Sequence, residues 1–400
     1  MTENNKALTR DFLIFLAVSF ALFLIKYPIE MSDFRVYYLT GERVLSGENV
    51  YNVTDKLEFK YLPVTALIFS IFGIIDSVEV AIIIWYFLNT ILIFLVLYKS
   101  IKLVRGHYDY KLFYGLFILF SLYLVRGLLL GQMNMLMVLL VLLTIEQLIN
   151  GKERKAGIFL GLSILIKPYT LIFLPYFLIS RNYKAFLFSF IILVMGLFSP
   201  FVVFGLQGGI EVYHSCFQLL NTTSDELYKS IDNVSIWSFY AKYLSDLTHA
   251  KFFAVVTILI VYAIFLFFAG KKRALEKETI LMDGAILLTL IPLFSPQGWF
   301  YQLTTGLLSI QLLFVYFDRL PLAAKIGLIT ALLIIPLSMY DVSGKVISRG
   351  IANLSILTLS FSLIVYLNIK LRLKTYNINY KSKDDQNFID MNILEEEKAA

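Results

Sequence analysis

The sequence predicts an all-α protein that crosses a membrane many times. Hydrophobic residues make up 58% of the 400 residues and charged residues 16%, whereas soluble domains are about half apolar and about a quarter charged. The apolar residues form blocks of about 18–25 residues between short charged turns, which is the pattern of transmembrane helices. The net charge of +6 arises in those turns, so it gives no reason to expect a nucleic-acid partner.

The N-terminal half of the pattern begins with an apolar block at 11–28. No small-residue cleavage pattern follows it, so we expect an uncleaved first span and not a signal peptide. The segment Tyr61–Ile75 is apolar but short for a hydrocarbon core about 30 Å thick. If it crossed, the basic loop 99–111 would lie outside. The positive-inside rule therefore favours an interfacial or re-entrant segment within a first outer loop at 29–77.

The remaining spans follow from the same rule. One helix kinked at Pro168 could cover 156–180, but a short hairpin keeps the basic residues before and after it inside, and we expect the hairpin. Residues 1–370 then form a single transmembrane domain with a second, polar outer loop at 206–250, and 371–400 form a disordered cytoplasmic tail. The twelve expected spans are 11–28, 78–98, 111–127, 132–149, 156–167, 168–180, 185–205, 251–270, 279–293, 300–317, 322–339 and 351–370.

Three ionisable residues at span ends on the outer face are candidates for function, because charge is costly there. Asp33 could accept a proton from an attacking hydroxyl; alternatively, Ser32 or Asp33 caps a helix that begins at Phe34. Lys167 could hold a phosphate as a point charge, or its head could simply reach the interface. Arg126 has the same two interpretations.

Several uncharged polar residues reach the same face. Gln132 and Asn134 could bind sugar hydroxyls, but they could also cap a helix or bond to a neighbouring helix. Trp299 and Tyr301 could stack on a sugar, although aromatic rings are common at any membrane interface. The histidines lack ligand partners at useful spacing and Cys216 is the one cysteine, so we expect no metal site and no cofactor.

Five motifs, in order from about residue 30 to 302, resemble those of glycosyltransferase family 87. No single motif is specific, whereas five in register are. Two positions depart from the family pattern: Val64 stands where a second proline is usual, and Phe300 follows the tryptophan in place of histidine. The motifs are Asp33-Phe-Arg-Val-Tyr-Tyr with Gly41, Gly47, Tyr51 and Phe59-Lys-Tyr-Leu-Pro63; Gly131-Gln-Met-Asn134; Ala156-Gly157 and Gly161 with Lys167-Pro168; Asn233-Val-Ser235; and Ser295-Pro-Gln-Gly-Trp299.

The resemblance implies a GT-C fold and a polyprenol-phosphate-mannose type of transferase. On this resemblance the catalytic base is Asp33, and Lys167 with Arg126 or Arg35 would hold the donor phosphate without a metal. The residues that would contact the sugar or the acceptor are Gln132, Asn134, Asn233, Trp299 and Tyr301. The implied partners are a polyprenyl-phosphate sugar, a lipid or glycan hydroxyl acceptor and membrane lipids. The implied location is the bacterial inner membrane, with the site on the extracytoplasmic side and the sugar transferred with inversion.

Two other classes share parts of this pattern. A secondary transporter usually places broken helices and ionisable pairs near the midplane, often with internal repeats, and the sequence shows no convincing repeat. A lipid-linked polysaccharide polymerase or ligase shares the many spans and the large outer loops. The aspartate directly after the first span, Asp33, favours the transferase.

Overall fold

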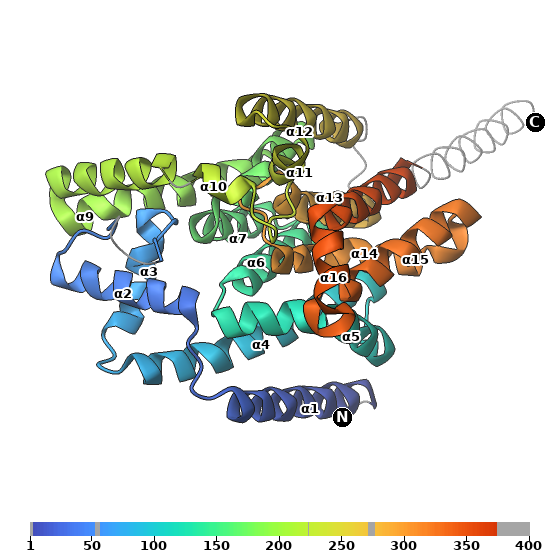
Figure 1. The fold of residues 1–400 in the computed structure, drawn as a ribbon, viewed down its shortest axis with the longest axis horizontal. Helices are drawn as coiled ribbons and strands as arrows, with labels where there is room; N and C mark the ends of the chain where they lie inside the picture. The colour runs from blue at the N-terminus through green and yellow to red at the C-terminus, as the bar shows by residue number, and fades with distance from the viewer. Residues whose placement is uncertain (1–2, 53–56, 223, 271–276, 374–400) are drawn as a thin grey trace, which may run out of the picture.

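The computed structural model describes residues 3–52, 57–222, 224–270 and 277–373. Within these ranges the protein consists of helices and their connections (Figure 1). An isolated antiparallel bridge joins Asn233 and Trp299. The tail predicted at 371–400 lies outside the described residues from 374 onward. The all-α prediction is therefore confirmed for the described part of the chain.

The helices follow the predicted apolar blocks closely. The α-helices are α1 (Glu3–Lys26), α2 (Ser32–Ser46), α3 (Pro63–Gly73), α4 (Val78–Arg105), α5 (Tyr110–Leu130), α6 (Asn134–Ile149), α7 (Glu153–Ile166), α8 (Phe173–Ile179), α9 (Tyr183–Thr222), α10 (Ser224–Tyr228), α11 (Ile236–Tyr243), α12 (Leu247–Gly270), α13 (Lys277–Phe294), α14 (Leu307–Val315), α15 (Leu322–Leu337), α16 (Tyr340–Asn353) and the helix Ile356–Leu373. The 3-10 helices are η1 (Pro168–Ile172), η2 (Phe300–Gly306) and η3 (Phe317–Arg319).

The chain is a helical membrane protein by the length and composition of its helices. Six helices in the described ranges are long and apolar enough to cross a membrane, or up to seven if α15 and α16, bent by 109°, count as one span. Other expected spans coincide with shorter apolar helices, among them α6 and the segments Pro168–Ile179 and Phe300–Val315. The number of crossings, expected to be twelve, remains a prediction.

The second outer loop at 206–250 stays a prediction, but its first part is helical, because α9 continues to Thr222. The helix breaks at Gly205, whose φ of 72° favours glycine, and the chain then folds back. The Tyr213 hydroxyl donates to the Leu197 carbonyl at 2.7 Å. Residues 206–222 are helical because Val212, Cys216 and Leu219 recur at helical spacing, and all three are buried.

The predicted hairpin at 156–180 is interrupted where expected. The first helix, α7, ends at Ile166, Lys167 is extended, and η1 begins at Pro168, so the segment is not one continuous helix. Helix α7 packs against α9 through small residues. A Cβ on Gly161 would lie 2.6 Å from the Cβ of Ile192, so only glycine permits this approach.

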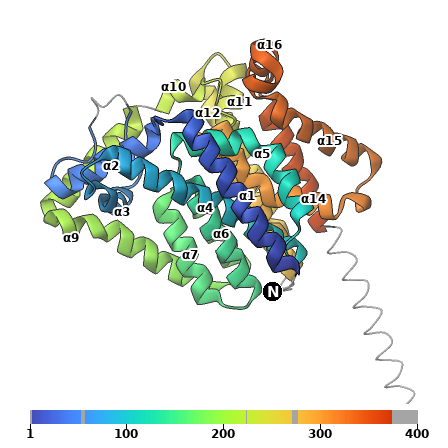
Figure 2. The ribbon, with the colours of Figure 1, turned by 90° about the horizontal axis from the view of Figure 1, so that it is seen from below.

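The two ends of the helix bundle differ in character. Helices α10, α11 and α16 gather at one end, whereas the N-terminus and the turn between α6 and α7 lie at the other (Figure 2). Backbone hydrogen bonds join the loops 230–235 and 295–300 at the end where α10, α11 and α16 lie. The Val234 amide donates to the Gly298 carbonyl at 2.7 Å, and the Phe300 amide donates to the Asp232 carbonyl at 3.1 Å.

Candidate active site

Breaks between helices bring five of the predicted site residues into one cluster. Asp33 lies in the first turn of α2, Gln132 between α5 and α6, and Asn134 at the start of α6. Lys167 lies between α7 and η1, and Tyr301 lies in η2. Residues nearly 270 positions apart in the chain therefore meet where helices end, and their polar side chains satisfy one another.

The Gln132 amide joins the carboxylate to the ammonium. Its Nε2 donates a short hydrogen bond to Asp33 Oδ2 and a second one to the Tyr301 hydroxyl at 3.3 Å. Its Oε1 accepts from Lys167 Nζ at 3.2 Å. This arrangement fixes the orientation of the amide, because the amide nitrogen must face the carboxylate and its oxygen the ammonium. Asp33 and Lys167 are thereby linked without a direct ion pair within 4.0 Å among the described side chains.

Gly131 places Gln132 at this position. It ends α5 with a φ of 74°, and a Cβ there would lie 2.6 Å from the Cβ of Phe34. Helix α2 can therefore approach the turn only because this residue is glycine. The Trp85 indole nitrogen donates to the Gly131 carbonyl at 2.8 Å, and its ring stacks on Phe34 at 5.4 Å. The motif Gly-Gln thus holds the amide rigidly beside α2.

Lys167 is buried, with 2% of its surface exposed, so its ammonium does not reach the interface as the alternative interpretation required. It donates to Asn134 Oδ1 at 2.6 Å and lies 5.3 Å from the centre of the Tyr61 ring. The Tyr61 hydroxyl lies 2.8 Å from that of Tyr37. Neutral amide oxygens and an aromatic face therefore satisfy this cation, which leaves its positive charge available to an anionic ligand.

Asp33 does not cap a helix. The first helical residue of α2 is Ser32, its N-cap is Met31, and no side chain caps it. Burial raises the pKa of the Asp33 carboxyl above its usual value, while the hydrogen bond from Gln132 and the charges of Lys167 and Arg126 oppose this rise. A carboxylate with a raised pKa is a stronger base, and its position beside donors keeps it oriented.

Three predicted site residues make other contacts. Arg35 donates to the Glu30 carbonyl at 2.8 Å, and its guanidinium lies 3.9 Å from Glu79. Arg35 lies two positions after Asp33 in α2, so its side chain points roughly 200° around the helix axis from that of Asp33. The Asn233 side chain is fully buried, and its hydrogen bonds to described residues go to backbone groups: it donates to two carbonyls and accepts from the Ser235 amide. Trp299 pairs with Asn233 through the backbone.

Other residues near the cluster were missed. Tyr61 belongs to a quoted motif, but its contact with Lys167 depends on the fold. Lys345 and Arg349 lie one turn apart on α16 and line a cavity with Lys242 and Arg126. In the sequence, their spacing of four residues within a polar segment was the feature that could have placed both side chains on one face of a helix. Within the described ranges, no group of three or more His, Cys, Asp or Glu side chains could hold a metal ion.

These features define a helical membrane protein with a partly buried carboxylate, a bridging amide and a buried ammonium where several of its helices end. The model of Glycosyltransferase family 87 matches residues 59–296, more than half of the chain, and the chain belongs to this family. The match covers Gln132, Asn134 and Lys167 but begins after Asp33, so the role of Asp33 rests on its contacts. No curated protein matches the sequence.

Proposed function

We propose that this membrane glycosyltransferase moves a hexose, with mannose the first candidate, from a polyprenyl phosphate to a hydroxyl of a lipid or glycan. The observation that carries the proposal is the Asp33–Gln132–Lys167 arrangement, because it places a base and a cation on one bridging amide. Sugar transfer from a phosphate ester needs both: one group removes the proton from the acceptor, and another stabilises the charge on the departing phosphate.

The step is a single displacement. The acceptor oxygen attacks the anomeric carbon while its proton passes to the Asp33 carboxylate, and the bond from that carbon to the phosphate oxygen breaks. The polyprenyl phosphate leaves with the electron pair, stabilised by Lys167 with Arg126. Attack and departure occur on opposite faces, so the anomeric configuration inverts. Lys167 donates to Gln132 and Asn134, so the third N–H of its ammonium can bind a phosphate oxygen.

The same proposal includes the topology. We propose twelve spans in a GT-C-type fold, with α2 and α3 at the interface, both termini inside, and the site on the extracytoplasmic face of a bacterial inner membrane. The apolar helices and the positive-inside rule support this arrangement. Single cysteines introduced in a Cys216→Ser background and treated with an impermeant thiol reagent test it. Labelling at residue 152 and protection at residue 232 would reverse the sidedness.

Transfer from radiolabelled polyprenyl-phosphate hexoses tests the chemistry. Membranes containing Asp33→Asn should lose transfer, whereas membranes containing Asp76→Asn, a change at an exposed carboxylate of the same outer loop, should retain it. Transfer by Asp33→Asn at the wild-type rate would remove this residue from the mechanism. An NMR analysis of the purified product that showed a retained anomeric configuration would exclude the single displacement.

A further inference from the structure

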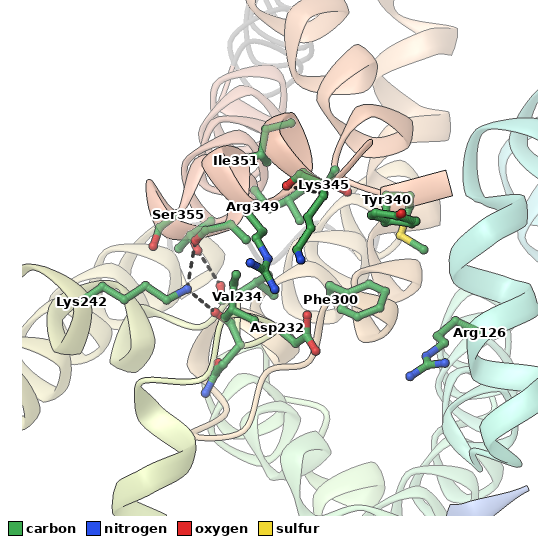
Figure 3. A pocket seen from close by; sticks show the side chains of 18 of the residues that line it. Arg126, Asp232, Val234, Lys242, Phe300, Tyr340, Lys345, Arg349, Ile351 and Ser355 are labelled. Atoms are coloured by element: carbon green, nitrogen blue, oxygen red, sulfur yellow. Dashed lines mark hydrogen bonds between the residues drawn. The ribbon is translucent and has the colours of Figure 1, made fainter. Parts of the chain in front are cut away.

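A cavity of about 560 Å³ lies beside the active-site cluster and holds an excess of positive charge. It is bounded by α5, the loop before α11, η2, α16 and the start of the last helix (Figure 3). Its lining includes four basic side chains: Arg126, Lys242, Lys345 and Arg349. It also includes two acidic side chains, Asp232 and Asp341.

The basic side chains converge from two walls. Lys345 and Arg349 extend from α16 toward the loop that carries Asp232, and Lys242 extends toward the same loop from the left of the view (Figure 3). Neither Lys345 nor Arg349 forms an ion pair with a described residue. Lys242 donates to the carbonyls of Asn233 at 3.2 Å and Ala352 at 3.1 Å. Lys345 and Arg349 are exposed, and basic side chains that gather without a carboxylate partner favour an anion such as a phosphate.

The electrostatics of Lys242 support an anionic ligand. Burial lowers the pKa of its ammonium to about 8, while the charge of Asp232 opposes this effect. Burying a cation without a counter-ion has a free-energy cost. A bound phosphate would add to the negative charge of Asp232 and favour the protonated amine.

An apolar groove adjoins this cavity. It has a volume of about 580 Å³ and lies between α11, α12, α13 and the helix Ile356–Leu373. Thr358 lines both spaces, and Val261, Leu290 and Val365 are among the apolar side chains along the groove. Because α12 and the last helix are candidate membrane spans, the occupant that suits this groove is a hydrocarbon chain.

The cavity also lies next to the active-site cluster, although the five residues of the cluster do not line it. Phe300 lines the cavity, and the next residue, Tyr301, accepts a hydrogen bond from Gln132. Arg126 lines the cavity and is close enough to Asp33 to favour its charged form. A headgroup held by α16 could therefore extend a hydroxyl toward Asp33. Of the two cations proposed for the donor phosphate, Lys167 lies outside this cavity and Arg126 lines it.

We infer that the acceptor is an anionic lipid whose phosphate binds at Lys242, Lys345 and Arg349, whose chain lies in the adjoining groove, and whose headgroup hydroxyl is directed to Asp33. This inference deepens the proposed function and rests on it. It assigns α16 to acceptor recognition and separates the acceptor phosphate from the donor phosphate.

Binding of phosphatidylglycerol, a lipid with one phosphate and free hydroxyls, tests the inference without any transfer reaction. In detergent, full-length protein should bind it at least tenfold more tightly than phosphatidylcholine, as measured by native mass spectrometry. The double variant Lys345→Gln/Arg349→Gln should lose about tenfold in affinity, because two charged contacts disappear. The double variant Arg181→Gln/Lys184→Gln, with the same change in charge on exposed residues outside the cavity, should bind as the wild type does.

Further measurements distinguish a lipid phosphate from free inorganic phosphate and from the donor phosphate. Ser362→Phe, which fills the groove, should weaken binding of long-chain but not short-chain phosphatidylglycerol. Equal affinity of the Lys345/Arg349 double variant and the wild type would overturn the inference, as would tight binding of inorganic phosphate alone at this cavity. If the Lys345/Arg349 double variant had an increased KM for the polyprenyl-phosphate donor and bound phosphatidylglycerol as the wild type does, the cavity would be assigned to the donor instead. These outcomes do not depend on whether Asp33→Asn retains transfer, which tests the proposed function separately.

Discussion

Replacing Gln132 by methionine tests the central arrangement most directly. Methionine has a similar length and fills a similar volume, so the packing is retained while both hydrogen-bonding atoms are removed. The native side chain donates to Asp33 and accepts from Lys167, and the residue is only 6% exposed. Water therefore cannot easily replace the lost contacts, and the two charged groups should lose their fixed relation.

The magnitude follows from the charged hydrogen bonds. A hydrogen bond to a charged group contributes about 1.5–3 kcal/mol. Because Gln132 orients both the base and the cation, the loss of that orientation should reduce kcat/KM by about tenfold to about a hundredfold. The bond from Gln132 stabilises the carboxylate, so its removal raises the pKa of Asp33 further. The base is then charged only at higher pH, and the acid limb of the pH profile should move upward.

The assay is the pH dependence of transfer from a labelled polyprenyl-phosphate hexose. Gln311→Met is the matched control, because Gln311 is equally buried but bonds to the neutral Ser100 hydroxyl at 2.7 Å. It should lower stability without moving the acid limb. If Gln132→Met kept a rate within about twofold of the wild type and an unshifted acid limb, the amide would not couple the base to the cation.

Three further predictions concern packing, a buried ion pair and pH. Gly161→Ala should reduce the free energy of unfolding by about 1–3 kcal/mol, because its Cβ would lie 2.6 Å from a side-chain carbon of α9. In Gly115→Ala the new Cβ meets nothing within 4 Å, and an equal melting temperature for the two variants in detergent would contradict the packing argument. Asp283→Asn should cost about 3–5 kcal/mol, because it leaves Arg372, 2.9 Å away and 5% exposed, without its counter-ion; thermal unfolding at an unchanged temperature would refute this. Since burial lowers the pKa of Lys242 to about 8, its ammonium loses its proton as the pH rises from about 7 to about 9. Binding of phosphatidylglycerol should weaken over that range in the wild type and less in Lys242→Arg, and equal pH profiles would argue against a charged Lys242 in binding.

The sequence determined most of the helices. A hydrocarbon core demands runs of apolar residues, so their lengths and the charged turns between them could be read along the chain. The break before Pro168 was also local, because proline cannot continue a helix from its preceding turn. The continuation of α9 beyond Gly205 was missed. Its buried positions recur at helical spacing, but its many polar residues favoured a loop over a helix.

The sequence predicted the candidate site residues less completely than the helices. Asp33 and Lys167 stood out because a charge at the end of a span is costly wherever it lies. Their proximity could not be derived, since it depends on how α2, α5 and α7 pack against one another. The different environment of Arg35 could be derived, since a spacing of two on a helix turns its side chain roughly 200° away from that of Asp33.

What the sequence determined by itself was therefore the set of apolar helices and the chemical types of the groups at their ends, because both follow from the cost of placing backbone and charge in lipid. Only the tertiary structure decided which of those groups meet. The bridge through Gln132 joins segments about a hundred residues apart, and the basic cavity beneath α16 joins α5 to segments of the C-terminal half. Such contacts arise from close packing of side chains, which depends on the whole fold and not on local spacing.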